Sequence, residues 1–387
     1  MMFALQLLFD CSSTYANCHS SHCTNQIEAA QDYIFTLQLR HFSNSQLLEQ
    51  TLSKLPNLMA LELQFGNKIS FDAPSQGQGF GMTQASEVIS LAGALQSMPN
   101  LCCLSLTNSQ LNDDLIRVFI NELKAKETNE DFFSIRDTLV ELNLSYNKLT
   151  TEGFRLVLLY FINGDNNHAA NHYQNSNDHD NDQDHERVLV SNDTSILSTL
   201  KIAGNKIRAE GARTLGRILK YNTSLENLDL RMNLLHDEGG SLVMNGLHHN
   251  QTLKRLNLSC NSLSSMTSDS LCAVFETSIG RPNGVASTAT ASCSDPPQGN
   301  MLERIDISSN EFKSSDIIKL SQAVEQTYTL LSLDLRENRV DAGTSNSNNN
   351  SIHNATTTEA LESIHEKLIS NASRITGSQS MPQRETQ

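Results

Sequence analysis

The sequence lacks a long apolar run and a surplus of basic residues. No apolar stretch approaches the roughly 20 residues that are needed to span a bilayer. The opening MMFALQLLF is short and has neither a basic flank nor a small-residue cleavage site, so we interpret it as a ragged start rather than a signal peptide. Lys and Arg number 28 against 43 Asp and Glu, a net charge of −15 at pH 7. This balance argues against nucleic acid and against anionic membranes as partners.

Enzyme motifs and a disulfide framework are also missing. No G-x-S-x-G, P-loop, H-E-x-x-H or G-x-G-x-x-G stands in a suitable context, so we expect no enzyme, no cofactor and no small-molecule substrate. The eight cysteines show no even spacing, which favours a reduced, intracellular protein. Cys and His residues gather at 18–23, and four His lie within 168–185. Neither stretch offers a complete ligand set on a rigid element, so we expect no metal site.

What the sequence does contain is a repeat with a period of 28 residues. SLENLDLRMNLL (224–235) is followed by TLKRLNLSCNSL (252–263) and preceded by ILSTLKIAGNKI (196–207). In the full template positions 1, 4, 6 and 11 are apolar and position 9 is Asn or a small polar residue, and the first two of the nine units match it least. Nine units begin at Ile34, Leu58, Leu101, Leu139, Leu197, Leu225, Leu253, Leu302 and Leu330.

Each unit predicts a short strand, a bend and a helix. In a strand, positions 4 and 6 point to the core while positions 3, 5 and 7 point outward. An Asn at position 9 can donate and accept hydrogen bonds, and so satisfy the backbone where the strand ends. The residues after Asn205 are apolar at helical spacing, and Gly153, Gly211 and Gly239 mark places where a helix starts close to its neighbour. Because one unit cannot bury its apolar face alone, the units must stack.

Irregular spacings locate insertions between units. Leu139 and Leu197 are 58 residues apart, which is 28 plus 30, and Leu253 and Leu302 are 49 apart, which is 28 plus 21. The extra segments are too polar to build a core. We therefore predict an irregular segment at 1–33, a repeat domain at 34–340 with disordered insertions at about 66–82, 163–190 and 278–300, and a polar tail at 341–387. Within that tail Leu361, Ile364 and Leu368 predict a short capping helix near 358–370.

Charged and amide side chains occupy the outward strand positions. The inner curve of a repeat array is its usual binding surface. Pairs such as Asp229 with Arg231 and Asp334 with Arg336 are either partner contacts or mutually neutralising surface charges. An exposed pair contributes only about 0–1 kcal/mol to folding, so stability alone need not require them. The candidate partner-binding residues are Glu141, Asn143, Lys201, Asp229, Arg231, Arg255, Arg304, Asp306, Asp334 and Arg336.

The unit LxxLxLxxNxL, with a helix ending in NTSL (222–225) or NQTL (250–253), resembles the ribonuclease-inhibitor type of leucine-rich repeat. This resemblance covers about 34–340. It implies an α/β fold, a ribonuclease-inhibitor-like horseshoe solenoid of about nine strand–helix units with a parallel sheet on its concave face. Function is not fixed by this class, which includes GTPase activators of the Ran-activating kind, cytosolic ribonuclease inhibitors and many scaffolds.

A narrower resemblance rests on the order of several motifs. FGMTQASEVISLAGAL (80–95), LCCLSLTNSQLNDD (101–114) and LVELNLSYNKLTTEG (139–153) are similar to the family of T-complex-associated testis-expressed protein 1, also called dynein regulatory complex subunit 5. The resemblance implies a non-enzymatic scaffold of the nexin–dynein regulatory complex in motile cilia and flagella. Its partners would be other protein subunits of that axonemal complex, and its location the cytoplasm and cytoskeleton. GTPase activators usually carry a strongly acidic run after the repeats, which this tail lacks.

Overall fold

The computed structural model describes residues 5–10, 34–40, 52, 54–64, 82, 84–127, 134–163, 195–277, 301–339 and 350–377. The chain divides into two compact units, Met1–Ile207 and Arg208–Gln387, each of which is described by itself. The predicted repeat domain 34–340 is thus shared between two units, which is compatible with an array whose repeats contact only their neighbours. Apart from Met82 and Asn163, the three predicted insertions lie outside the described residues.

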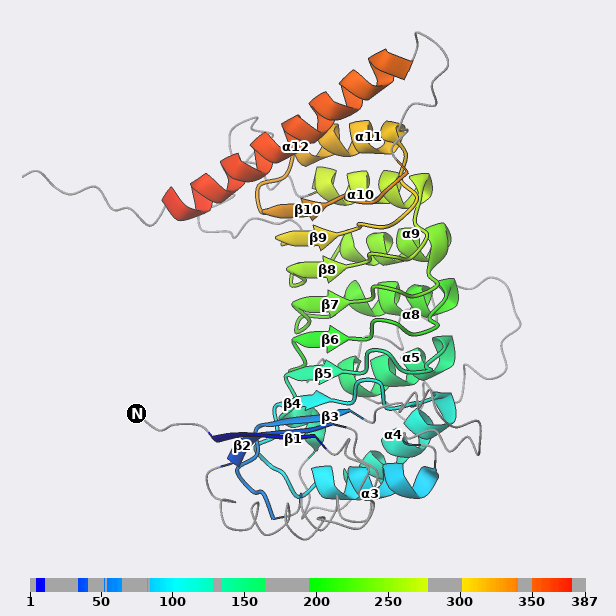
Figure 1. Cartoon of the computed structure of the whole chain (residues 1–387), viewed down its shortest axis with the longest axis vertical. Helices are drawn as coiled ribbons and strands as arrows, with labels where there is room; N and C mark the ends of the chain where they lie inside the picture. Colours follow the sequence, from blue (N-terminus) through cyan, green and yellow to red (C-terminus); the bar gives the residue numbers. More distant parts are fainter. Residues whose placement is uncertain are drawn as a thin grey trace, which may run out of the picture. The chain divides into compact units, whose positions relative to one another are not determined.

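Unit 1 contains parallel strands backed by helices (Figure 1). Its strands are β1 (Leu5–Asp10), β2 (Ile34–Arg40), β3 (Ala60–Gln64), β4 (Cys103–Ser105), β5 (Glu141–Asn143) and β6 (Thr199–Lys201), and neighbours in sequence pair in parallel. Its helices are α3 (Ala85–Leu95), α4 (Asp113–Glu127), the 3-10 turn η2 (Ile135–Asp137) and α5 (Thr151–Val157), which continues as the π-helical turn η3 (Leu158–Ile162). Helices α3, α4 and α5 pack in sequence order.

Strand β1 corrects the prediction of an irregular segment at 1–33. Leu7 pairs with Leu37 and Phe9 with Leu39, so this strand extends the sheet beyond the first predicted unit. Leu5, Leu7 and Phe9 alternate with their neighbours as a strand requires. The interpretation of the opening stretch as a ragged start did not take this alternation into account.

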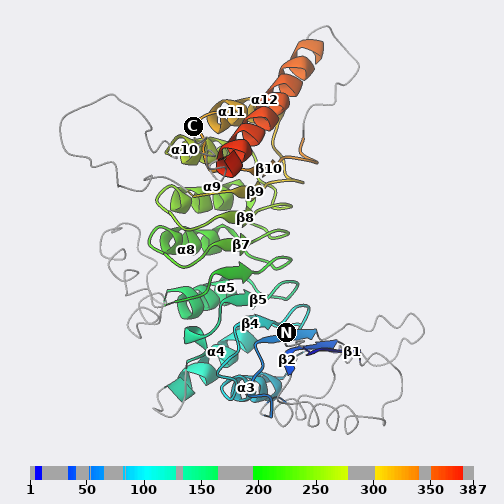
Figure 2. The ribbon, with the colours of Figure 1, turned by 90° about the vertical axis from the view of Figure 1, so that its left-hand side faces the viewer.

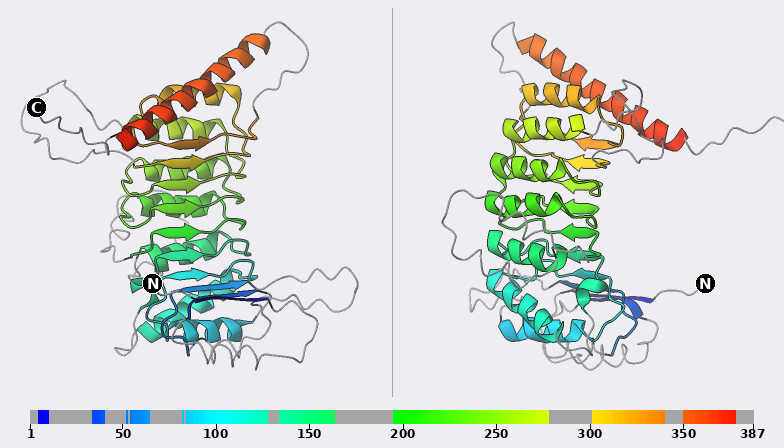
Figure 3. Two further views of the ribbon diagram at one scale, coloured as in Figure 1. Left: turned by 60° about the vertical axis from the view of Figure 1, so that its left-hand side comes forward. Right: turned by 180° about the vertical axis from the view of Figure 1, so that it is seen from behind.

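Unit 2 repeats one pattern of helix and strand (Figures 1 and 3). Its elements are α8 (Ala209–Leu219), β7 (Asn227–Asp229), α9 (His236–Leu247), β8 (Arg255–Asn257), α10 (Ser265–Thr277), β9 (Arg304–Asp306), α11 (Ser314–Val324), β10 (Ser332–Asp334) and α12 (Asn350–Gly377). Strands β7 to β10 pair in parallel in sequence order. From β4 onward every strand covers positions 3 to 5 of a predicted unit, which confirms the leucine-rich repeat fold.

The leucines at position 4 of the repeats form the centre of the apolar core in each of the two compact units. In unit 1 Leu142 lies opposite Leu200 across neighbouring strands, and in unit 2 Leu228 lies opposite Leu256. These four side chains are at most 3% exposed. The predicted stacking of position 4 is therefore confirmed within each unit, and burial of this apolar surface is the main contribution to stability.

The residue at position 9 joins consecutive coils, where one coil is a single repeat of strand, bend and helix. The Asn310 amide nitrogen Nδ2 donates to the carbonyl of Ile307 in its own coil (3.0 Å) and to that of Leu258 in the coil before it (3.1 Å). Its Oδ1 accepts from the backbone N–H groups of Asn261 (2.9 Å) and Leu263 (3.1 Å). Asn205 makes the same kind of bonds in unit 1. The expectation that this amide satisfies the bend is confirmed.

The residue before this asparagine adopts a left-handed backbone. Position 8 has a φ between 50° and 63° in the described turns at Asn108, Tyr146, Gly204, Met232, Cys260, Ser309 and Glu337. Only one of these is glycine, although side chains disfavour this conformation. At Gly204 a Cβ would lie 2.5 Å from the Tyr146 ring, so this turn has no room for a side chain.

Glycine also permits a close approach of helices α8 and α9. A Cβ placed on Gly246 would lie 2.4 Å from the carbonyl oxygen of Gly216, and a Cβ on Gly216 would lie 2.4 Å from that of Leu242. Both glycines are buried. The backbones of the two helices therefore meet without intervening side chains.

Helix α12 differs from the predicted capping helix in length and in its packed face. It spans Asn350–Gly377 rather than about 358–370, and it packs against α11 (Figure 2). Ile364 is buried as expected, but Leu361 is 40% exposed. The packed face is rotated because polar anchors hold the helix: Asn371 Nδ2 donates to the carbonyl of Leu330 (2.9 Å), and Lys367 Nζ donates to that of Glu325 (2.7 Å).

Truncating a core leucine should destabilise unit 2 strongly. Leu258→Ala removes a fully buried side chain and leaves a cavity, and we expect a loss of about 2–5 kcal/mol, as for Leu230→Ala. Urea denaturation followed by circular dichroism measures this. Leu234→Ala is the matched control, because that leucine is 39% exposed and should cost much less. Equal losses in Leu258→Ala and Leu234→Ala would contradict the assignment of inward and outward positions.

Adding one methyl group between α8 and α9 should also be costly. Gly246→Ala forces the Gly216 carbonyl away, and we expect a loss of about 1–3 kcal/mol from overpacking. The adjacent Asn245→Ala replaces an exposed residue of the same helix and should be neutral or slightly stabilising, since Ala favours helix. The midpoints of thermal unfolding of both variants test this. A Gly246→Ala protein as stable as the parent would exclude the close backbone contact.

Candidate interaction surface

The candidate partner-binding residues all point away from the buried leucines. Glu141, Asn143 and Lys201 lie on β5 and β6 of unit 1, and each flanks a fully buried leucine on its strand. The remaining candidates belong to unit 2. Glu141, Arg255 and Arg304 occupy position 3; Asn143, Lys201, Asp229, Asp306 and Asp334 occupy position 5; Arg231 and Arg336 occupy position 7. The outward positions 3, 5 and 7 of β7 to β10 are called the strand face below.

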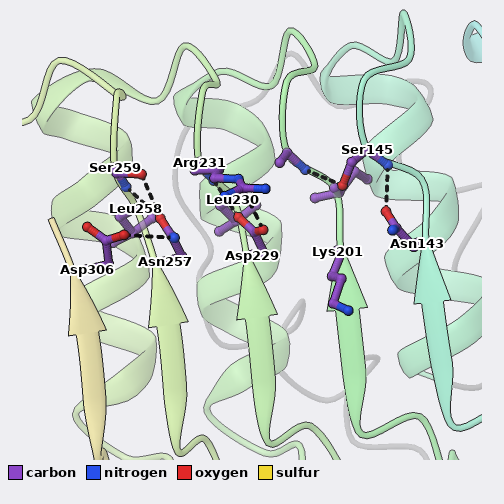
Figure 4. Close-up of polar contacts among 12 residues, drawn as sticks. Asn143, Ser145, Lys201, Asp229, Leu230, Arg231, Asn257, Leu258, Ser259 and Asp306 are labelled. Carbon is purple, nitrogen blue, oxygen red and sulfur yellow. Dashed lines mark hydrogen bonds and ion pairs between the residues drawn. The ribbon is translucent and has the colours of Figure 1, made fainter. Parts of the chain in front are cut away.

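Position 5 has a structural role that the sequence analysis missed. The side-chain oxygen of Asp229 accepts from the backbone N–H of Arg231 (3.1 Å), and Asn257 accepts from Ser259 (3.0 Å). Asn143 does the same for Ser145 in unit 1 (Figure 4). Asp306 and Asp334 repeat the arrangement with Ser308 and Arg336. Asx side chains bond the backbone two residues on, and here this satisfies an N–H where the strand ends. The visible signal was Asn or Asp recurring at position 5.

The two charged pairs at positions 5 and 7 are ion pairs in the structure. Arg231 Nε lies 3.4 Å from Asp229 Oδ2, and Arg336 Nη2 lies 2.5 Å from Asp334 Oδ2. Hydrogen bonding by Arg336 is the main cause that lowers the pKa of Asp334. In unit 1 Lys201 Nζ lies 2.5 Å from Glu141 Oε1 on the neighbouring strand. These contacts neutralise much of the outward charge within each unit.

Arg255 and Arg304 are arranged differently. They face each other across β8 and β9, at the same register and on the same side. Arg255 Nη1 donates to Asn227 Oδ1 (2.7 Å), which is a neutral acceptor. Within the described part of the chain, Arg304 makes no ion pair and no side-chain hydrogen bond. This part of the strand face therefore presents two guanidinium groups without a carboxylate partner.

Asp237 has a strongly shifted pKa, but it serves the fold. Burial raises its pKa, but hydrogen bonds from Ser264 and Thr267 outweigh that effect and lower the pKa to about 2. Asp237 lies in the first turn of α9, yet its Oδ1 accepts from the N–H groups of Ser264 (2.9 Å) and Thr267 (2.8 Å) at the start of α10. A carboxylate in the first turn of a helix ordinarily stabilises the N-terminus of that helix, whereas this one caps the next helix.

The Cys103 thiol on β4 is a poor nucleophile. Burial, followed by the Coulombic effect of Cys102, raises the pKa of Cys103 to about 11. The two Sγ atoms lie 3.8 Å apart. Because the thiolate is the reactive form, Cys103 is largely protonated at neutral pH.

Two further findings concern metals and membranes. In the ranges that the structure describes, no three His, Cys, Asp or Glu side chains are grouped so that they could hold a metal ion. The stretches 18–23 and 168–185, which were weighed as metal candidates, lie outside those ranges. None of the described helices is both long and apolar enough to cross a membrane.

Comparison with known proteins gives the class of the repeats. The Leucine Rich repeat family model matches residues 138–155, 221–244 and 249–265. Leucine-rich repeat-containing protein 45 of Gallus gallus is 39% identical over 77 residues, which are 19% of this chain and 11% of that protein. The match thus spans about a tenth of that relative's length.

Solved structures with similar folds have low sequence identity. An internalin from Listeria monocytogenes is 16% identical with a TM-score of 0.37, covering 81% of this chain and 72% of the internalin. The leucine-rich repeat-containing protein LegL7 from Legionella pneumophila is 16% identical with a TM-score of 0.42, covering 88% and 85%.

The repeat geometry, together with the match to the family model, defines a leucine-rich repeat fold. Strands of three residues recur at fixed positions of the repeat, each followed by a bend and a helix or helical turn. Such repeats suggest a scaffold that binds other proteins, because stacking places outward side chains of successive strands on one continuous surface.

The cap at the start of α10 predicts a pH-dependent contribution to stability. The folded-state pKa of Asp237 lies below the ordinary 3.8, so its contribution is present above pH 4 and is lost as the pH falls toward 2. Asp237→Asn should therefore cost about 1–2 kcal/mol at pH 7 and progressively less in acid. Urea titrations at several pH values measure the difference. Asp269→Asn, which removes an exposed carboxylate from α10, should cost less at pH 7. A constant Asp237→Asn penalty from pH 7 to pH 2 would contradict this role.

Proposed function

We propose that this chain is a non-enzymatic scaffold subunit of the nexin–dynein regulatory complex in motile cilia and flagella. It would regulate dynein-driven motility by contacts with other subunits of that complex. The observation that carries the scaffold role is the strand face, on which charged side chains stand at fixed intervals on a rigid sheet. Its inward side is filled by leucines, and position 5 is tied to the backbone, so the outward groups are held in place before a partner binds.

The assignment to the axonemal complex is supported by the resemblance described for 80–95, 101–114 and 139–153. One element of the first motif is firmly attached in unit 1. The side chain of Met82 is 1% exposed, and its backbone N–H donates to the carbonyl of Ser109 (3.0 Å). Met82 therefore lies against the bend of the repeat that begins at Leu101, and α3 covers residues 85–95 of the motif.

A GTPase activator or a cytosolic ribonuclease-inhibitor-like regulator, built on the same repeat, is the alternative. A ribonuclease-inhibitor-like binder would use an acidic surface for basic partners. On the strand face, however, Asp229 and Asp334 are already paired with arginines. This pairing favours the scaffold over the inhibitor-like function.

Localisation in a flagellated cell tests the proposal most directly. The tagged full chain should remain on axonemes after the membrane is removed with detergent, and it should co-purify with dynein regulatory complex subunits. A diffuse cytosolic signal would contradict the proposal, and a nuclear-envelope signal would favour the GTPase-regulating alternative.

A matched pair of variants tests whether the strand face docks the protein on the axoneme. The first replaces Arg231, Arg255, Arg304 and Arg336 by Ser, and the second replaces Arg213 and Arg217 on α8, Lys220 just beyond its end and Lys319 on α11 by Ser. Both lose four positive charges. Only the first should lose axonemal retention if the strand face docks the protein. Equal retention of the two variants would place the docking surface elsewhere.

A further inference from the structure

We propose that Arg255 and Arg304 form a binding site for carboxylate side chains in an acidic segment of a partner protein. The inference rests on the proposal that the strand face is a docking surface, and it specifies the chemistry of the partner. It concerns the centre of the strand face, where β8 and β9 lie side by side between β7 and β10.

The geometry places the two guanidinium groups on neighbouring strands. Arg255 and Arg304 are register partners at position 3, so their backbones are about 4.8 Å apart. Both residues are exposed. Asn227 and Ser332 flank them at the same register on β7 and β10, and neither carries a charge. The result is a row of four outward residues with two cations at its centre.

The electrostatics make this pair costly unless an anion binds. Like charges directly opposite each other on adjacent strands destabilise a sheet. Arg255 is held by the neutral Asn227, and Arg304 has no ion-pairing partner among the described residues. The nearby carboxylate of Asp306 is engaged by the Asn257 amide (2.9 Å) and by Ser308. The strand face thus offers unneutralised cations although the chain as a whole carries a charge of −15.

The surroundings favour a carboxylate over a phosphate. Two guanidinium groups can each donate several parallel hydrogen bonds to an anion, which is the arrangement that carboxylates and phosphates share. Asp306 lies two residues along the same face of β9, and Asp334 lies on β10. These negative charges repel a dianionic phosphate more than a monoanionic carboxylate. A Glu- or Asp-rich peptide segment therefore fits the site.

Binding of a fluorescein-labelled hexaglutamate peptide tests the inference. Fluorescence anisotropy at low salt should show binding to the full chain, and the Arg255→Gln/Arg304→Gln double variant should bind about tenfold or more weakly. The control double variant Arg213→Gln/Arg217→Gln loses the same charge on α8 and should change the affinity less than about twofold. Equal loss in both double variants, or no loss in either, would overturn the site.

Two further measurements sharpen the test. Asp306→Asn removes a neighbouring negative charge and should tighten hexaglutamate binding, an effect that a damaged fold cannot produce. Arg304→Gln alone, which breaks no ion pair or side-chain hydrogen bond among the described residues, should weaken binding if the double variant does not fold. A phosphoserine peptide of the same length that binds tenfold tighter than hexaglutamate would overturn the carboxylate assignment.

Failure of this inference is distinguishable from failure of the proposed function. If the parent chain is absent from axonemes, the proposed axonemal scaffold role is contradicted. The hexaglutamate measurement then still decides whether the carboxylate site exists. Retention of the parent chain, together with unchanged hexaglutamate affinity of the Arg255→Gln/Arg304→Gln variant, overturns the carboxylate site alone.

Discussion

The amide of the asparagine at position 9 bonds two consecutive coils at once, and the arrangement of each strand end follows from it. Asn310 contacts five backbone groups of its own coil and the previous one, which fixes both the end of the strand and the distance to the neighbour. With that distance set, the leucines of position 4 come into register and exclude water. The apolar core and the hydrogen bonds of the asparagines therefore depend on each other, and neither can form in a single isolated repeat.

The same constraint determines which surface is free to act. Position 5 satisfies the backbone, and in two strands its carboxylate is also paired with the arginine at position 7. What remains for a partner is mainly position 3, where side chains are furthest from the bend. Arg255 and Arg304 lie there. Fold and recognition are thus separated along each strand, the carboxyl end maintaining the coil and the amino end being available for contact.

Much of this arrangement could be predicted from the sequence, because the spacing of leucines and asparagines maps directly onto a strand and a bend. The outward direction of Asp229 and Arg231 follows from the same alternation. What the sequence does not reveal is the partner of each polar atom. Whether Asp237 caps its own helix or the next depends on how two helices sit side by side, and the rotated face of α12 depends on where Asn371 finds a carbonyl. Strand β1 was missed for a simpler reason, since it lies outside the repeat pattern although its pairing partner β2 lies within the first unit.

The left-handed residue at position 8 has a consequence for how the chain folds. Each such residue other than glycine costs about 1 kcal/mol before any neighbour is present. A lone coil would tend to relax out of this turn, whereas a docked coil is held in it by the asparagine of the next. Ordering should consequently spread along the array from a seed, coil after coil. Gly204 adopts the left-handed conformation without this cost, so ordering should start at its turn.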